Sequence, residues 1–179
     1  MIKEGLRFYF SSLIKNVPQD VYSVLLALFF IIVILIVVFN KSILRKGVSR
    51  LLIVEYSVII YYITVFSRKA NHVRKFDFTP FWSYERPDLF LENVMNVVVF
   101  IPVGILLGYA LTNVKLWKVL VVGLLLSLPI EILQFLFKKG FAEIDDVMHN
   151  VLGCMIGYGV YALLRFLYEK FSKRRVAVL

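Results

Sequence analysis

Carboxylates, amides and one histidine recur at helical spacing beside strongly apolar segments of this chain. Glu131 and Gln134 are three residues apart and Asp146 and Asn150 are four apart, so each pair shares one face of a helix. A charged group inside a membrane costs about 2.5–3.5 kcal/mol on insertion scales, and it therefore normally faces the interior of a helix bundle. If such a site is catalytic, Glu131 is the candidate general base, with Asp146 and His149 as further candidate catalytic residues.

The elements that must position these residues are membrane spans. Of the 179 residues, 60% are hydrophobic and 18% are charged, whereas soluble domains average about 45–50% and about 25%. We predict an all-α, multi-pass membrane protein forming a single domain over residues 1–179, with an N-terminal interfacial helix over residues 1–20. The five predicted spans cover about residues 21–39, 51–66, 94–111, 116–137 and 147–168.

Alternating chain direction brings the polar ends of spans two to five to the same membrane face. The second and fourth spans end in polar residues, and the third and fifth spans begin with them. We therefore expect these residues to line a shared pocket for a polar ligand. The predicted ligand-binding residues are Arg68, Glu92, Asn93, Asn96, Glu131, Gln134, Lys138, Lys139, Glu143, Asp145, Asp146 and Asn150.

Most of these residues also have a purely structural interpretation. Asp145 and Asp146 could cap the fifth helix and interact with its dipole, which contributes about 0.3–1 kcal/mol. Asn96 and Asn150 could hold neighbouring helices together by hydrogen bonds of about 0.6 kcal/mol each. Glu131 is the exception, because no structural need explains a carboxylate at that depth in a span.

Basic residues predict the orientation. Segment 40–50 and the tail over 170–175 are both basic and lie next to spans. By the positive-inside rule both face the cytoplasm, which places the N-terminus and the polar face outside and the C-terminus inside. The net charge of +9 then favours contact with anionic lipid, and nothing indicates nucleic acid as a partner. The single cysteine, Cys154, excludes an internal disulfide.

Three ordered motifs lie within roughly residues 55–160. They are Asn96-x-x-x-Phe100-x-Pro102-x-Gly104, Glu131-x-x-Gln134 and Glu143-Ile-Asp145-Asp146-x-x-x-Asn150-x-x-Gly153. Together with Ser67-Arg68 and Thr79-Pro80-Phe81, these motifs resemble the VanZ family. The resemblance implies a multi-pass bacterial membrane protein. Some family members are linked to reduced susceptibility to teicoplanin and related lipoglycopeptides, and the resemblance supplies no established reaction.

The chain departs from the family pattern at two places. Many relatives have an arginine shortly before the acidic cluster, where this chain has Lys138, Lys139 and Gly140. Many also have a threonine after the asparagine, where this chain has Val151. Lysine binds an anion as a point charge and lacks the planar fork of arginine, so bidentate recognition of a phosphate is not expected from these lysines.

Three functions remain open from the sequence. The first is a membrane protein whose outward-facing polar pocket binds a lipid-linked or anionic ligand, with a membrane lipid or a lipid-linked cell-wall precursor as the partner. It would alter how glycopeptide antibiotics meet their target. The second is an enzyme acting on such a lipid with a divalent cation, Mg²⁺ or Ca²⁺, held by Glu143, Asp145 and Asp146. The third is a scaffold in which the polar cluster only locks the bundle. No other cofactor is indicated.

Overall fold

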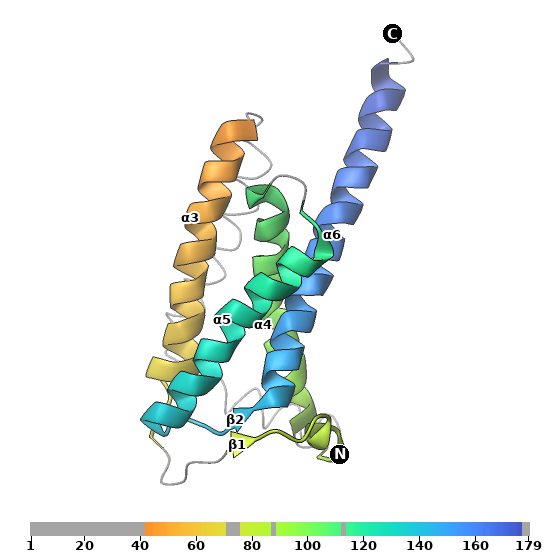
Figure 1. The fold of residues 1–179 in the computed structure, drawn as a ribbon. Coiled ribbons are helices and arrows are strands. Elements are labelled where there is room, and N and C mark those ends of the chain that lie inside the picture. Colours follow the sequence, from red (N-terminus) through yellow and green to blue (C-terminus); the bar gives the residue numbers. More distant parts are fainter. Residues whose placement is uncertain (1–41, 71–75, 87–88, 112–113, 177–179) are drawn as a thin grey trace.

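The structure is a computed structural model that describes residues 42–70, 76–86, 89–111 and 114–176. Four long helices form an antiparallel bundle, and two very short strands lie at one end of it (Figure 1). In chain order the elements are α3 (Ser42–Tyr61), the π-helical turn η1 (Tyr62–Phe66), β1 (Phe76–Asp77), the 3-10 turn η2 (Trp82–Glu85), α4 (Phe90–Ala110), α5 (Leu116–Phe137), β2 (Ala142–Glu143) and α6 (Ile144–Val176).

The all-α prediction is confirmed for these residues, and four of their helices are long and apolar enough to cross a membrane. These candidate spans are Arg45–Phe66, Glu92–Ala110, Leu116–Phe137 and Ile144–Lys170, which correspond to the second to fifth predicted spans. The first predicted span and the interfacial helix lie outside the described residues.

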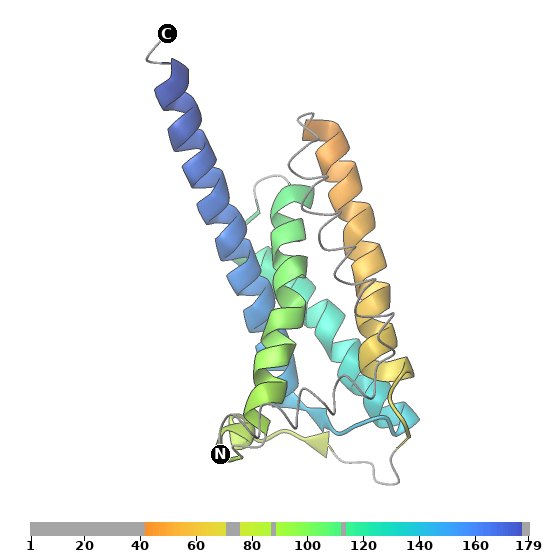
Figure 2. The same cartoon turned by 180° about the vertical axis from the view of Figure 1, so that it is seen from behind.

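Two helix boundaries differ from the predictions. Helix α3 begins at Ser42 and not near residue 51, so the basic segment after residue 41 is helical. Arginine and lysine favour helices and can extend their charged ends toward water, so the helix need not stop at them. Helix α6 runs for 33 residues, about 50 Å at 1.5 Å per residue. Its C-terminal part projects beyond the other three helices (Figures 1 and 2).

Glycines allow α6 to lie directly against α4, its most extensive neighbour. A Cβ atom added at Gly153 would collide with the main-chain oxygen of Val97, and one added at Gly157 would collide with that of Ile101. These glycines therefore form a close packing seam between α4 and α6. Between lipid-exposed helices such close approach matters, because burial of apolar surface gives little driving force there.

Two tyrosines of α3 donate hydrogen bonds to main-chain oxygens of α4 and α5 close to the proline in each helix. The Tyr56 hydroxyl donates to the main-chain oxygen of Val99 at 2.9 Å, three residues before Pro102 of α4. Tyr61 likewise donates to Leu126 at 3.0 Å, three residues before Pro129 of α5. A proline removes the backbone hydrogen bond to the carbonyl four residues before it, and each tyrosine donates to the carbonyl next to that one.

The α4–α6 contact generates the first prediction. Gly157→Ala should lower the free energy of unfolding by about 1–3 kcal/mol, because the added methyl group forces the two backbones apart. Gly159→Ala is the matched control on the same helix, since nothing lies within 4 Å of a Cβ added there. Thermal unfolding of the purified protein in detergent measures both. Equal melting temperatures for the two variants would contradict the close packing.

Candidate functional site

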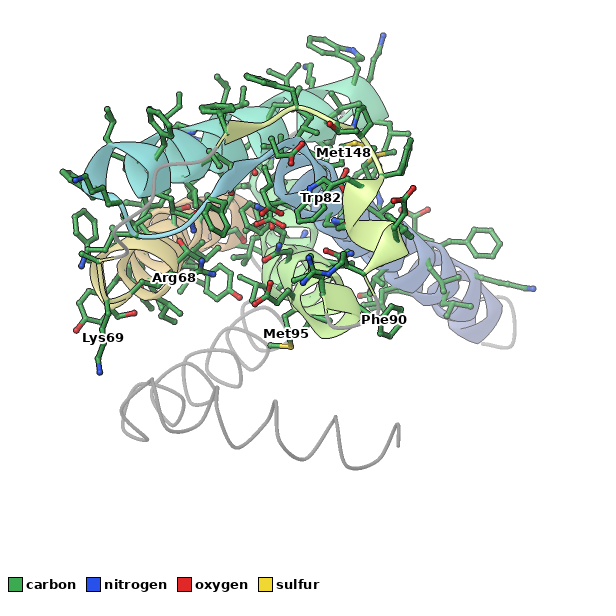
Figure 3. The ribbon with its side chains drawn as sticks, turned by 90° about the horizontal axis from the view of Figure 1, so that it is seen from below. Arg68, Lys69, Trp82, Phe90, Met95 and Met148 are labelled. Atoms are coloured by element: carbon green, nitrogen blue, oxygen red, sulfur yellow. The ribbon has the colours of Figure 1, made fainter. Side chains whose placement is uncertain are left out.

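The polar residues named from the sequence meet at the end of the bundle that carries β1 and β2. Figure 3 views this end, with Arg68 just after η1 and Trp82 on η2. The strands pair in parallel, with Phe76 opposite Ala142 and Asp77 opposite Glu143. This pairing ties the segment after α3 to the segment before α6, and it was not predicted. The four helix ends thus lie together at one end of the bundle, as the alternating chain direction predicts (Figure 1).

Glu131 and Asp146 lie at the centre of this region. We call these two residues, together with Arg68 and Asn96, the carboxylate cluster. Glu131 is 4% exposed, and its Oε2 accepts a hydrogen bond of 3.2 Å from the main-chain N–H of Glu143. Asp146 Oδ1 accepts a hydrogen bond of 2.7 Å from Asn96 Nδ2. The two carboxylates repel each other, and Arg68 attracts both. The cluster thus joins α4, α5, β2 and α6.

Amide side chains lie on either side of the two carboxylates. Asn150, one turn after Asp146, donates from Nδ2 to Ser127 Oγ at 2.9 Å. Gln134 donates from Nε2 to the main-chain oxygen of Thr64 at 3.0 Å. In the described part of the chain, Asn150 Oδ1 and Gln134 Oε1 are buried without a hydrogen-bond partner. Such an unsatisfied buried acceptor costs about 1–3 kcal/mol unless a further donor reaches it.

Asp145 faces a different way from Asp146. Its Oδ1 accepts from the N–H of Phe81 at 2.6 Å, and its Oδ2 accepts from the N–H and the hydroxyl of Ser83 at 3.0 and 2.6 Å. Asn93 Nδ2 also donates to Ser83 Oγ, at 3.0 Å. These bonds hold η2 on the start of α6, next to Phe81 in the left-handed region with φ 65°. Asp145 and Asn93 therefore have a structural role, and a ligand role for them stays a prediction.

His149 also faces η2. Its Nε2 lies 2.9 Å from the Tyr84 hydroxyl, and the two rings stack with centroids 5.6 Å apart. Asp145 and His149 are four residues apart, as are Asp146 and Asn150, so α6 presents one pair to η2 and the other to α4 and α5. The candidate catalytic histidine is thus held on a different side of α6 from the carboxylate cluster.

Glu92, Lys138 and Lys139 are exposed or half-buried, as Arg68 is, and we call these residues the rim of the carboxylate cluster. Lys139 Nζ donates to the main-chain oxygen of Arg68. Lys138 ends α5 in the left-handed conformation, with φ 55°. Glu92 is exposed and its charge acts on Asp146. Ser127 was not predicted, although its position four residues before Glu131 was a usable signal.

The suggested divalent cation stays a prediction. Within the described segments, no three histidine, cysteine, aspartate or glutamate side chains are arranged so that they could hold a metal ion. Of the proposed ligands, Asp145 accepts from three protein donors, one of Phe81 and two of Ser83, while Asp146 accepts from Asn96.

Comparison with known proteins places this arrangement in a family. The family described as VanZ/LLP1 matches residues 22–165, a range that contains the whole carboxylate cluster. The chain belongs to the VanZ/LLP1 family. Protein VanZ of Enterococcus faecium is 33% identical to it over 125 residues, which cover 66% of this chain and 76% of that protein. No solved structure matches the chain.

The different surroundings of the adjacent aspartates generate the second prediction. Asp145→Asn should destabilise the protein by about 1–3 kcal/mol, because the new amide N–H₂ must face the N–H of Phe81 or of Ser83. Asp146→Asn is the control, since its amide oxygen can still accept from Asn96. Thermal unfolding in detergent distinguishes them. Melting at the same temperature would mean that Asp145 does not anchor η2.

Proposed function

We propose that the carboxylate cluster of this VanZ-family membrane protein binds the polar head group of a membrane lipid or of a lipid-linked cell-wall precursor. The observation that carries this proposal is the buried carboxylate of Glu131 next to the half-buried carboxylate of Asp146, with two buried amide oxygens nearby that have no described donor. Packing alone does not require this excess of acceptors within membrane spans. A ligand that supplies donors removes the cost.

The cellular effect that we propose is reduced susceptibility to teicoplanin and related glycopeptides. This step rests on the family resemblance, because some VanZ-family members are linked to that phenotype. A protein that holds a lipid-linked precursor or a lipid at the outer surface changes how these antibiotics reach their target. The proposal therefore needs the carboxylate cluster to face outward.

The distribution of basic residues supports this orientation. Arg45, Lys46 and Arg50 lie at the start of α3, and Lys170 lies toward the end of α6. These two helix ends are at the opposite end of the bundle from β1 and β2 (Figure 1). The positive-inside rule assigns them to the cytoplasm, with the C-terminus. With five spans, the N-terminus is outside.

A purely structural role is the competing proposal. The hydrogen bonds from Asn96 to Asp146 and from Asn150 to Ser127 connect α6 to α4 and α5. On this proposal the carboxylates are retained because they fix how the helices pack. The two roles differ in what neutral substitutions do, because a structural pair is needed for stability and a ligand site is needed only for activity.

The third prediction separates these roles. Glu131→Gln keeps the shape of the side chain and an acceptor for the Glu143 N–H while removing a buried charge, so stability should be unchanged or higher. Any teicoplanin tolerance that the protein confers on a sensitive host should fall to the level of the host alone. The measurements are the minimal inhibitory concentration, the membrane abundance and the melting temperature.

Glu169→Gln is the matched control for this experiment, since Glu169 lies far along α6 in an exposed pair with Arg165. It should retain tolerance. A large loss of stability in Glu131→Gln would support the structural role, and full tolerance in Glu131→Gln would refute a functional site at this carboxylate.

The fourth prediction concerns orientation. In a Cys154→Ala background, a cysteine replacing the exposed Glu85 should react with a membrane-impermeant thiol reagent in intact cells. One replacing the exposed Lys170 should react only after the cells are opened. Labelling by mass shift on a gel measures both. The reverse pattern would place the carboxylate cluster on the cytoplasmic side.

A further inference from the structure

The carboxylate cluster has different charges at its exposed and buried ends. The exposed end is the rim, and the buried end, which we call the floor, is formed by Glu131, Asp146, Gln134 and Asn150. Arg68 is exposed at the rim, and its guanidinium donates no hydrogen bond to any described residue, although its field reaches Glu131 and Asp146. Lys139 lies beside it, bonded to the main-chain oxygen of Arg68. The rim at Arg68 and Lys139 therefore offers positive charge and free N–H donors, which suit a phosphate, while the exposed Glu92 adds a negative charge that acts on Asp146.

The floor has the opposite character. One oxygen of each carboxylate is used, Glu131 Oε2 by the N–H of Glu143 and Asp146 Oδ1 by Asn96. The other oxygen of each carboxylate receives no hydrogen bond from a described donor. Gln134 Oε1 and Asn150 Oδ1 lie above and below the carboxylates, in residues that are 2% and 4% exposed, and they also have no partner. The floor thus holds two buried amide oxygens without a described donor, beside the remaining oxygen of each carboxylate.

We infer that the head group bound by this site is zwitterionic, with its phosphate against Arg68 at the rim and a primary ammonium group between Glu131 and Asp146. This inference rests on the proposed function and specifies its ligand class, a phosphate ester of an amino alcohol. An ammonium group has three donors, no acceptor and a positive charge. It satisfies acceptors on the floor and offsets the repulsion between the two carboxylates.

Other head groups match the two layers less well. A purely anionic group reaching the floor would meet two carboxylates and be repelled. A glycerol or sugar phosphate would supply hydroxyl donors to the floor but no positive charge. The order of the layers also fixes the direction of binding, because the phosphate must remain at the exposed end and the ammonium group must enter first.

The test uses the full-length protein in detergent and three short-chain lipids that differ at one group. Dihexanoyl phosphatidylethanolamine carries the phosphate and the ammonium group. Its N-acetyl derivative keeps the phosphate and loses the charge, and dihexanoyl phosphatidylglycerol offers hydroxyls instead. Native mass spectrometry measures the affinity of each lipid, after thermal unfolding has shown that every variant is folded.

Phosphatidylethanolamine should bind about tenfold more tightly than its N-acetyl derivative, as expected for the loss of one charge-assisted hydrogen bond. Glu131→Gln and Asp146→Asn should each reduce this preference. Arg68→Gln should lower the affinity for both lipids by a similar factor, because Arg68 contacts the phosphate that they share on this proposal. Glu169→Gln should change nothing.

Two kinds of result would overturn the inference. Equal affinity for phosphatidylethanolamine and its N-acetyl derivative, or for phosphatidylglycerol, would show that the ammonium group is not recognised. If that equal binding still weakens in Arg68→Gln and Glu131→Gln, the proposed lipid site stands without this ligand class. If the affinities for all three lipids are unchanged in both Arg68→Gln and Glu131→Gln, the proposed function fails as well.

Discussion

Glu131 lies within an apolar helix, and the free energy needed to keep a carboxylate there constrains the segments around it. Water is scarce at this depth, so protein donors and charges must take its place. The chain supplies an N–H from β2, a guanidinium from the end of α3, and an amide from α4 on the neighbouring Asp146. Each comes from a different segment, so the position of Glu131 constrains how these segments meet.

Helix α6 links the polar end to the rest of the bundle because each of its faces contacts a different segment. One face carries Asp145 and His149 and holds η2 through hydrogen bonds. Another face carries Asp146 and Asn150, which bond to α4 and α5. Further along, Gly153 and Gly157 bring its backbone against that of α4. Small residues set the distance between α4 and α6, and that distance lets the short side chain of Asn96 reach Asp146.

The helices and their convergence could be predicted from the sequence because both follow from local patterns. Apolar runs define the spans, and alternating direction brings their polar ends together whatever the detailed packing. The separation of Asp145 from Asp146 was available in principle, since helical spacing pairs them with His149 and Asn150 respectively. The roles of these two pairs could not be predicted, because they depend on which segment faces each side of α6.

The end of the bundle around η2 was beyond sequence reasoning for physical reasons. Strands of two residues have no alternating pattern, so the pairing of β1 with β2 leaves no periodic signal. The bonds from Phe81 and Ser83 to Asp145 join residues more than 60 positions apart, and they use main-chain N–H groups, which every residue type except proline carries. Only the tertiary structure shows that this aspartate receives them.

The length of α6 has a consequence for where the polar end lies in the bilayer. From Asp146 to Lys170 the helix rises about 36 Å, whereas the hydrocarbon core is roughly 30 Å thick. When the basic end of α6 stays among the head groups of one leaflet, Asp146 reaches the head-group layer of the other. In a thicker bilayer the same helix would draw the carboxylates deeper, further from the head groups, and in a thinner one it would tilt. Membrane thickness is therefore a variable that acts directly on the surroundings of Glu131 and Asp146.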